Sequence, residues 1–320
     1  MPSRELLTKR YVPIVIIIIA AVGMFGILPQ FSNFANSLTA MKQASPGLLV
    51  MAVGVNLLAY VCAACIYMSL ALKPLRFGST LLVQLAGLLI NRVIPAGLGG
   101  LGLNFLYLRA HKHGNVQAGA VVALNNVIGL VGHLLLLFGF ILFGSATLHT
   151  IHVSSQQLWI ALAILVVVVV LVVIALYVWQ RRWRKAWQQL KVTVLLYRRS
   201  PTKLVLALLF SWGLTLSTVL ALWLCTRAVG LELNFFTVFV VYSVGVFAGT
   251  AIPTPGGLGG LEAAIVTGLV TQHVSAALAL AAVLLFRLLS FWLGLAIGAV
   301  ATLVMQRKGL LRSPVTSLRA

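Results

Sequence analysis

The sequence predicts an all-α polytopic membrane protein with an inverted-topology repeat, and three observations lead to that fold class. Sixty-one per cent of the 320 residues are hydrophobic, and only eight per cent are charged. Several apolar runs reach about twenty residues, the length that a helix needs to cross a hydrocarbon layer of roughly 30 Å. A Pro/Gly-rich stretch interrupts the chain once in each half, and the two copies lie 160 residues apart.

The two Pro/Gly-rich stretches match each other almost residue for residue. The first, Pro95–Gly102, reads P-A-G-L-G-G-L-G, and the second, Ile252–Glu262, reads I-P-T-P-G-G-L-G-G-L-E. A shift of 160 residues superposes Pro95 on Pro255. Neither stretch can form an uninterrupted helix, because proline lacks the amide hydrogen and glycine leaves the backbone loose. Broken backbone at membrane depth must be buried in protein or face water, so each stretch predicts the tip of a helical hairpin.

Six full spans are expected around these hairpins, and the basic residues give their orientation. Most of the 23 Lys and Arg residues lie at the N-terminus, in three connecting segments and in the C-terminal tail. This positive-inside pattern places both termini in the cytoplasm, with residues 29–46 as an outer loop. The first hairpin, within 79–108, then opens inward, and the second, within 235–272, opens outward. The expected spans are Tyr11–Leu28, Leu48–Leu72, Val116–Phe143, Leu158–Trp179, Leu204–Thr226 and Ser275–Met305.

One transmembrane domain is expected to occupy the whole chain, 1–320. Its first inverted repeat covers 11–145 and its second covers 158–306, each with about four helical elements. A basic cytoplasmic linker over 180–203 joins the repeats and overlaps the second. The sequence contains no long polar segment, so we expect no attached soluble catalytic domain, and we expect the protein in the plasma membrane.

The net charge of +20 does not indicate nucleic-acid binding, because most of the basic residues lie in alternate loops. Anionic inner-leaflet lipids are the expected partner of residues 181–203, with a specific protein partner as the alternative. No cofactor is expected. Cys62 and Cys65 are spaced like a redox pair, but they lie in an apolar span and are interpreted as packing residues.

Three ionisable residues are predicted at membrane depth, where charge is costly. Glu262 follows the second break directly, Arg287 lies well inside the last span, and Arg92 lies three residues before Pro95. A cation at that depth costs at least about 2.5–3.5 kcal/mol on insertion scales, so each arginine should face a partner or an aqueous cavity. Snorkelling is the alternative for Arg92. Glu262 has three interpretations: a helix cap, a proton carrier, or the counter-ion of a nearby arginine.

Two interrupted helices and two buried guanidinium groups favour a phosphate or another anion as the ligand. Free N–H groups at a helix start and the planar guanidinium both match the oxygens of such a group. The alternatives are close helix packing for the glycines and interhelical hydrogen bonding for the asparagines. The predicted substrate-binding residues are Arg92, Arg287, Glu262, Gly97, Gly99, Gly100, Gly257, Gly259, Gly260, Asn91, Asn125 and Asn126.

No pattern of catalytic residues stands out in the sequence. We find no paired carboxylates, no nucleophile with a base, and no clustered His and Cys ligands, so we expect neither an enzyme nor a metal site. His133 is isolated on an apolar helix, and we interpret it as structural.

The second motif resembles the signature of the lysylphosphatidylglycerol synthase transmembrane-region family. The similarity rests on Pro253–Glu262 and on Leu285-Phe-Arg287-Leu, and it extends over nearly the whole chain. It implies a membrane protein that moves, or helps to move, a phospholipid or polyprenyl-linked lipid between leaflets, with Glu262 and Arg287 on the family motif. Many members carry acidic residues where this chain has Asn125 and Asn126. The aminoacyl-transferase domain of the fused members has no counterpart in this sequence, so lipid aminoacylation is not implied.

We therefore expect a flippase-like protein that carries a lipid with an anionic phosphate headgroup, by alternating access to a midplane site. The lipid is a phospholipid or a polyprenyl phosphate. Two other classes remain open at this point: a non-transporting scaffold for a lipid-modifying or glycosyl-transfer enzyme, and a transporter of a small soluble anion.

Overall fold

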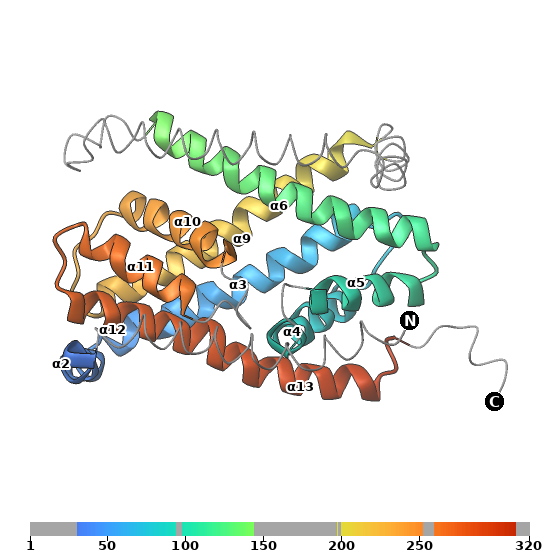
Figure 1. The fold of residues 1–320 in the computed structure, drawn as a ribbon. Helices are drawn as coiled ribbons and strands as arrows, with labels where there is room; N and C mark the ends of the chain where they lie inside the picture. Colours follow the sequence, from blue (N-terminus) through green and yellow to red (C-terminus); the bar gives the residue numbers. More distant parts are fainter. Residues whose placement is uncertain (1–30, 94–97, 144–196, 198–199, 252–258, 312–320) are drawn as a thin grey trace, which may run out of the picture.

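The computed structural model describes residues 31–93, 98–143, 197, 200–251 and 259–311, and within them it contains helices and short connections but no strand. Four helical stretches of this part of the chain are long and apolar enough to cross a membrane. An all-helical membrane protein is therefore confirmed (Figure 1). The four stretches are α3 (Pro46–Leu70), α6 (Asn115–Phe143), α9 (Pro201–Ala228), and the run formed by α12 (Ala276–Arg287), η6 (Leu288–Trp292) and α13 (Leu293–Arg307).

These stretches match four of the six expected spans. The expected spans 11–28 and 158–179 lie outside the described residues, as does most of the linker 180–203. Helices α3 and α9 hold the same place in the two expected repeats, and they pack against each other extensively. Gly213 of α9 permits this approach, because a Cβ there would lie 3.0 Å from Sγ of Cys62 on α3.

Each broken stretch separates a pair of contacting helices, as the two motifs predict. The first pair is α4 (Phe77–Val93) with α5 (Leu98–Ala110), and the second is α10 (Phe235–Ala251) with α11 (Gly260–Val270). At 1.5 Å per residue, α5 and α11 are about 20 and 17 Å long, too short to cross the hydrocarbon layer. Figure 1 shows α4 and α5 toward one end of the molecule and α10 and α11 toward the other. Hairpins that enter from opposite sides require this arrangement.

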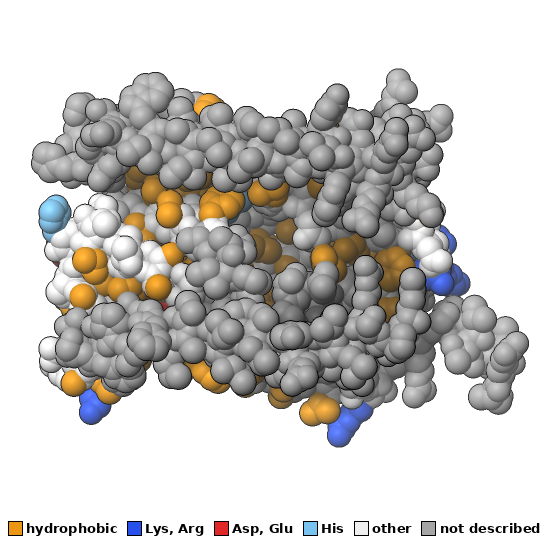
Figure 2. Space-filling view, in the orientation of Figure 1, with side chains coloured by type: hydrophobic (Ala, Val, Ile, Leu, Met, Phe, Trp, Pro, Cys, Tyr) orange, Lys and Arg blue, Asp and Glu red, His pale blue; other side chains and the backbone are white. Residues whose placement is uncertain are grey.

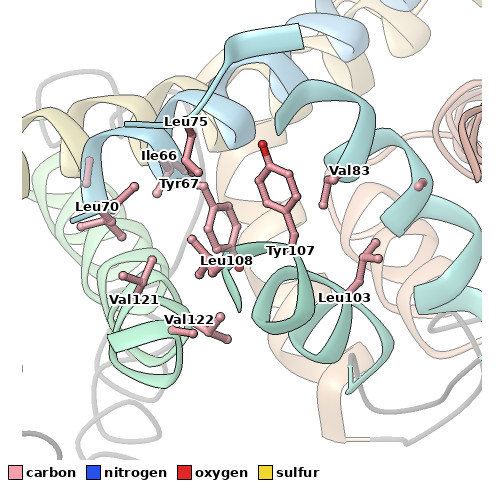
Figure 3. Packing of buried hydrophobic residues seen from close by; sticks show 14 of the residues in the cluster. Ile66, Tyr67, Leu70, Leu75, Val83, Leu103, Tyr107, Leu108, Val121 and Val122 are labelled. Atoms are coloured by element: carbon pink, nitrogen blue, oxygen red, sulfur yellow. The ribbon is translucent and has the colours of Figure 1, made fainter. Parts of the chain in front are cut away.

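A separate hydrophobic core surrounds each hairpin. Around the first, Tyr107 and Leu108 of α5 are almost fully buried against residues of α3, α4 and α6 (Figure 3). The Tyr107 hydroxyl lies 3.0 Å from Oγ1 of Thr80 and thereby joins the open ends of the hairpin. Around the second, Phe239 of α10 and Leu269 of α11 are buried against α9 and α12.

The outer faces of the two hairpins are covered in different ways. Helix α13 lies directly on α4, because a Cβ on Gly298 would lie only 2.6 Å from the backbone nitrogen of Leu89. Helix α6 instead meets α10 through large rings: Phe140 stacks on Phe239 with 4.4 Å between centroids. His133 also packs on Phe239, as its structural interpretation requires. The α4–α13 contact is thus close, and the α6–α10 contact is wide and aromatic.

Two features differ from the expected spans. The expected outer loop 29–46 contains a helix, α2 (Phe31–Lys42), which packs on α12, where Ser37 Oγ donates to the carbonyl of Ala277 at 2.9 Å. Its mixed polar and apolar sequence lacks the long apolar run from which spans were predicted. The last expected span is also interrupted, by the π-helical turn η6, which sequence periodicity does not signal.

The open end of the first hairpin is held by a buried histidine. His113 Nε2 accepts a hydrogen bond from the backbone nitrogen of Lys73 at 3.2 Å, and Nδ1 lies 3.1 Å from the carbonyl of Leu108. The Lys73 ammonium donates to the carbonyl of Lys112. Burial lowers the pKa of His113, which favours the neutral ring that these bonds require.

Figure 2 shows Lys and Arg side chains at the end of the molecule where the first hairpin opens, and hydrophobic side chains along its length.

Candidate functional site

Glu262 lies in the first turn of α11 and caps the start of that helix. Its Oε2 accepts a hydrogen bond from the backbone nitrogen of Gly259 at 2.8 Å, and Gly259 has φ +88°, a conformation that glycine adopts without strain. Its Oε1 lies 2.7 Å from Nε of Arg287. The cap and counter-ion interpretations are therefore both confirmed as contacts. The pair is shielded, since the side chains of Arg287 and Glu262 are 11% and 17% exposed.

Arg287 is the last residue of α12, and η6 follows it directly. In η6 the backbone nitrogen of Leu293 donates to the carbonyl of Leu288, five residues back, which widens the helix. This turn carries Phe291, a buried ring that lies 5.8 Å from Cζ of Arg287 and 4.5 Å from Cζ of Arg92. One aromatic ring therefore receives two guanidinium groups, each of which is attracted by its π-electrons.

Arg92 reaches the same turn from the end of α4. Its Nη2 donates to the carbonyl of Ser290 at 2.8 Å, and its Nη1 donates to the carbonyl of Leu88 at 2.5 Å. Its Nε is buried and has no hydrogen-bond partner among the described residues. Within the same residues Arg92 forms no salt bridge, because Glu262 is engaged with Arg287. Arg92 is thus a partly buried cation that carbonyl groups solvate in part and that no described carboxylate neutralises.

Helices from both halves of the chain surround this charge. A Cβ on Gly294 of α13 would lie 3.3 Å from Nη2 of Arg92, so a side chain there would press on the guanidinium that lies against the helix. Tyr60 of α3 lies at the same point, since this Cβ on Gly294 would lie 3.7 Å from the Tyr60 hydroxyl oxygen. Tyr242 of α10 packs its ring edge-on against Phe286, the residue before Arg287, with 6.3 Å between centroids. The site therefore lies where α3 and α4 meet α10, α11, α12 and η6.

The glycines of the first motif are fixed by amide side chains. Asn91 Oδ1 accepts from the backbone nitrogen of Gly100 at 2.5 Å, and Asn104 Nδ2 donates to the carbonyl of Gly100 at 2.9 Å. Gln84 Nε2 in turn donates to Asn104 Oδ1 at 2.8 Å. A Cβ on Gly99 would lie 2.5 Å from the carbonyl oxygen of Ile90, so only glycine fits there. Asn91, Gly99 and Gly100 therefore shape the hairpin tip next to Arg92.

The remaining predicted residues do not all join this cluster. Gly97 and Gly257 lie outside the described residues, whereas Gly259 and Gly260 form the start of α11. Asn126 donates to the carbonyl of Val122 at 2.8 Å, a bond within α6, and no described contact links Asn125 to either arginine. The two asparagines thus lie on α6, whose Leu136, Leu137 and Phe140 pack against the core around the second hairpin.

Sequence reasoning missed the residues that organise the arginines, namely Ser290 and Phe291 of η6, Gly294 and Tyr60. It also missed Gln84 and Asn104, which fix Gly100. One signal was available. Phe291 follows Arg287 by four residues, the spacing at which side chains meet on a helix. The Ser290 carbonyl carries no sequence signal, because its availability depends on the π-helical turn.

Comparison with known proteins gives a family but no individual relative. The model of the family described as lysylphosphatidylglycerol synthase TM region matches residues 14–298, which include both hairpins and the arginine site. No curated protein matches the chain. Because the family model covers most of the sequence, the chain belongs to the lysylphosphatidylglycerol synthase TM region family.

Proposed function

We propose that this protein moves a lipid with an anionic phosphate headgroup, a phospholipid or a polyprenyl phosphate, between the two leaflets of the plasma membrane. The observation that carries the proposal is the partly buried Arg92, which has no acidic partner among the described residues and lies beside the Arg287–Glu262 pair. A buried charge without a counter-ion is costly, and a transient anionic ligand would offset that cost.

A phosphate group fits the donors that Arg92 can offer. The planar guanidinium can bind two phosphate oxygens at once, and the unpartnered Nε lies on the same fork. The bonds to Ser290 and Leu88 fix the plane of the fork before a ligand arrives. The cation is thus held by neutral carbonyl groups, which leave its positive charge in place for an anion.

Two features favour a lipid over a soluble anion. The family is one of lipid-related membrane proteins, and the helices around the site are apolar along their outer faces.

The unequal contacts of α13 on α4 and of α6 on α10 support alternating access. In an inverted repeat the α4–α13 contact and the α6–α10 contact are equivalent. A transporter that is open to one side of the membrane closes one of two such contacts and widens the other.

Lipid exchange in proteoliposomes tests the proposal. The protein should accelerate leaflet exchange of an acyl-labelled fluorescent phosphatidylglycerol, and Arg92→Gln should remove at least about nine-tenths of that rate. Arg227→Gln is the matched control, because it removes an exposed arginine at the end of α9. The Arg227 guanidinium lies over the ring of Trp223. This variant should keep the wild-type rate.

The two rival functions give different results in the same vesicles. Uptake of labelled inorganic phosphate without lipid exchange would make the protein a small-anion transporter. Absence of both activities from folded protein would favour a scaffold for a membrane enzyme and would refute the proposal.

The orientation that we propose has both termini in the cytoplasm, so that the first hairpin opens inward and the second opens outward. Single cysteines in a cysteine-free background test it with a membrane-impermeant thiol reagent on intact cells. Cysteine at Gln272, after α11, should be labelled, and cysteine at Lys112, after α5, should not. Labelling of both positions from outside would contradict the opposed hairpins.

A further inference from the structure

We infer that the site is matched to a headgroup with a single negative charge, a phosphodiester, and disfavours a phosphate monoester, which carries close to two. The inference rests on the proposed function and chooses between the two lipid classes that it leaves open. It follows from the balance of charge around Arg92, Arg287 and Glu262.

The described charged side chains at the site sum to a single positive charge. Arg92 and Arg287 are close enough to interact electrostatically, and Glu262 forms an ion pair with one of them. Among the described residues, the other titratable groups that face the arginines are the hydroxyl groups of Tyr60 and Tyr242, which are neutral near pH 7. By sequence, the breaks 94–97 and 252–258 contain no Asp, Glu, Lys, Arg or His.

Glu262 is bound too firmly to be a mobile counter-ion. One carboxylate oxygen caps Gly259 and the other meets Arg287, so a movement of this side chain would break both contacts together. The negative charge at Arg287 is therefore a fixed part of the site. One cation remains to be neutralised by a ligand, and that cation is Arg92.

A phosphodiester supplies one negative charge at every pH near neutrality, because it has a single ionisable oxygen. A phosphate monoester has a second pKa of about 6 and carries nearly two charges at pH 7 and above. Its second charge would have no cation left in the described site and would face the fixed carboxylate of Glu262. In a shielded environment that imbalance is amplified, because charge interactions are weakly screened.

The exchange rates of two lipids that have the same acyl chains and different headgroups test the inference. In neutral phosphatidylcholine vesicles at pH 8, the wild-type protein should exchange acyl-labelled phosphatidylglycerol at least about tenfold faster than acyl-labelled phosphatidic acid. The substitution Glu262→Gln should raise the relative rate of phosphatidic acid by about tenfold or more. Glutamine is accepted at this position of a capping box, so the α11 cap is kept while one negative charge is removed.

Glu232→Gln is the matched control, because it removes an exposed carboxylate from the connection between α9 and α10. The net charge of the chain changes equally, and the lipid preference should stay at the wild-type value. A change of equal size in both variants would show that overall charge, not the site, sets the preference, and would overturn the inference.

Wild-type protein alone gives a second test that does not depend on folding of a variant. Between pH 8 and pH 5.5 phosphatidic acid takes up its second proton, so its exchange rate should rise toward that of phosphatidylglycerol. Exchange of phosphatidic acid as fast as phosphatidylglycerol at pH 8 would overturn the charge match. Absence of exchange for both lipids would instead refute the proposed function.

Discussion

The two hairpins share a Pro/Gly-rich motif, yet they satisfy their broken backbone by different means. In the first, the neutral amides of Asn91 and Asn104 bond to the backbone nitrogen and carbonyl of Gly100. In the second, the carboxylate of Glu262 caps Gly259 and also binds Arg287. The duplication aligns Gly102 with Glu262, so the acid exists in one copy only.

This difference explains why the two arginines are not equivalent. The second hairpin uses a charge to close its helix start, and that charge neutralises Arg287. The first hairpin uses none, so Arg92 keeps its charge for another group. A repeated motif therefore produces an asymmetric site, in which one half provides structure and the other provides the unpaired cation.

The largest effect is expected from glycine at the first hairpin. We expect Gly99→Val to abolish recovery of folded protein, because a Cβ there would lie 2.5 Å from the backbone oxygen of Ile90, which cannot move aside. Gly102→Val is the control on the same helix, since a Cβ at Gly102 meets nothing within 4 Å. Size-exclusion chromatography of both variants makes the comparison, and normal yield of Gly99→Val would contradict the close approach.

The second hairpin should be sensitive to charge. We expect Arg287→Gln to lower the free energy of unfolding by about 3 kcal/mol, because it leaves the carboxylate of Glu262 buried without its cation. The double variant Arg287→Gln with Glu262→Gln should recover most of that loss. Thermal unfolding in detergent measures the cycle, and additive losses would show that the two residues are not coupled.

The smallest effect concerns the histidines that follow the two hairpins, since the shift of 160 residues aligns the buried His113 with the exposed His273. Burial lowers the pKa of His113 below 6.5, and the neighbouring Lys73 and His111 lower it further. The unfolded chain then binds more protons than the folded chain below pH 6.5, so stability is present above that pH and falls as the pH drops.

Unfolding at pH 7.5 and pH 5.5 tests this pH dependence. Wild-type protein and His273→Gln should both lose stability at the lower pH, and His113→Gln should lose less. An identical loss in all three proteins would show that the titrating group lies elsewhere.

The sequence was sufficient to predict the helical hairpins and to single out the charged residues that the structure brings together. Proline and glycine break helices wherever they occur, so both breaks fall where the motifs predict, and intramembrane cost singles out Arg92, Arg287 and Glu262. Their pairing could not be predicted, because it depends on how α11 meets α12 across the bundle. The role of Ser290 was equally hidden, because a π-helical turn frees a carbonyl without a distinctive residue type.

In the proposed function, Arg92 binds the headgroup and the Arg287–Glu262 pair supports the site. Lipid exchange by two variants tests it most directly. Arg92→Gln should lose at least about nine-tenths of the phosphatidylglycerol exchange rate. The double variant Arg287→Gln with Glu262→Gln keeps the single positive charge at the site and should retain a substantial part of that rate. Wild-type exchange by Arg92→Gln, together with loss of exchange in the double variant, would contradict the claim and place the headgroup at Arg287.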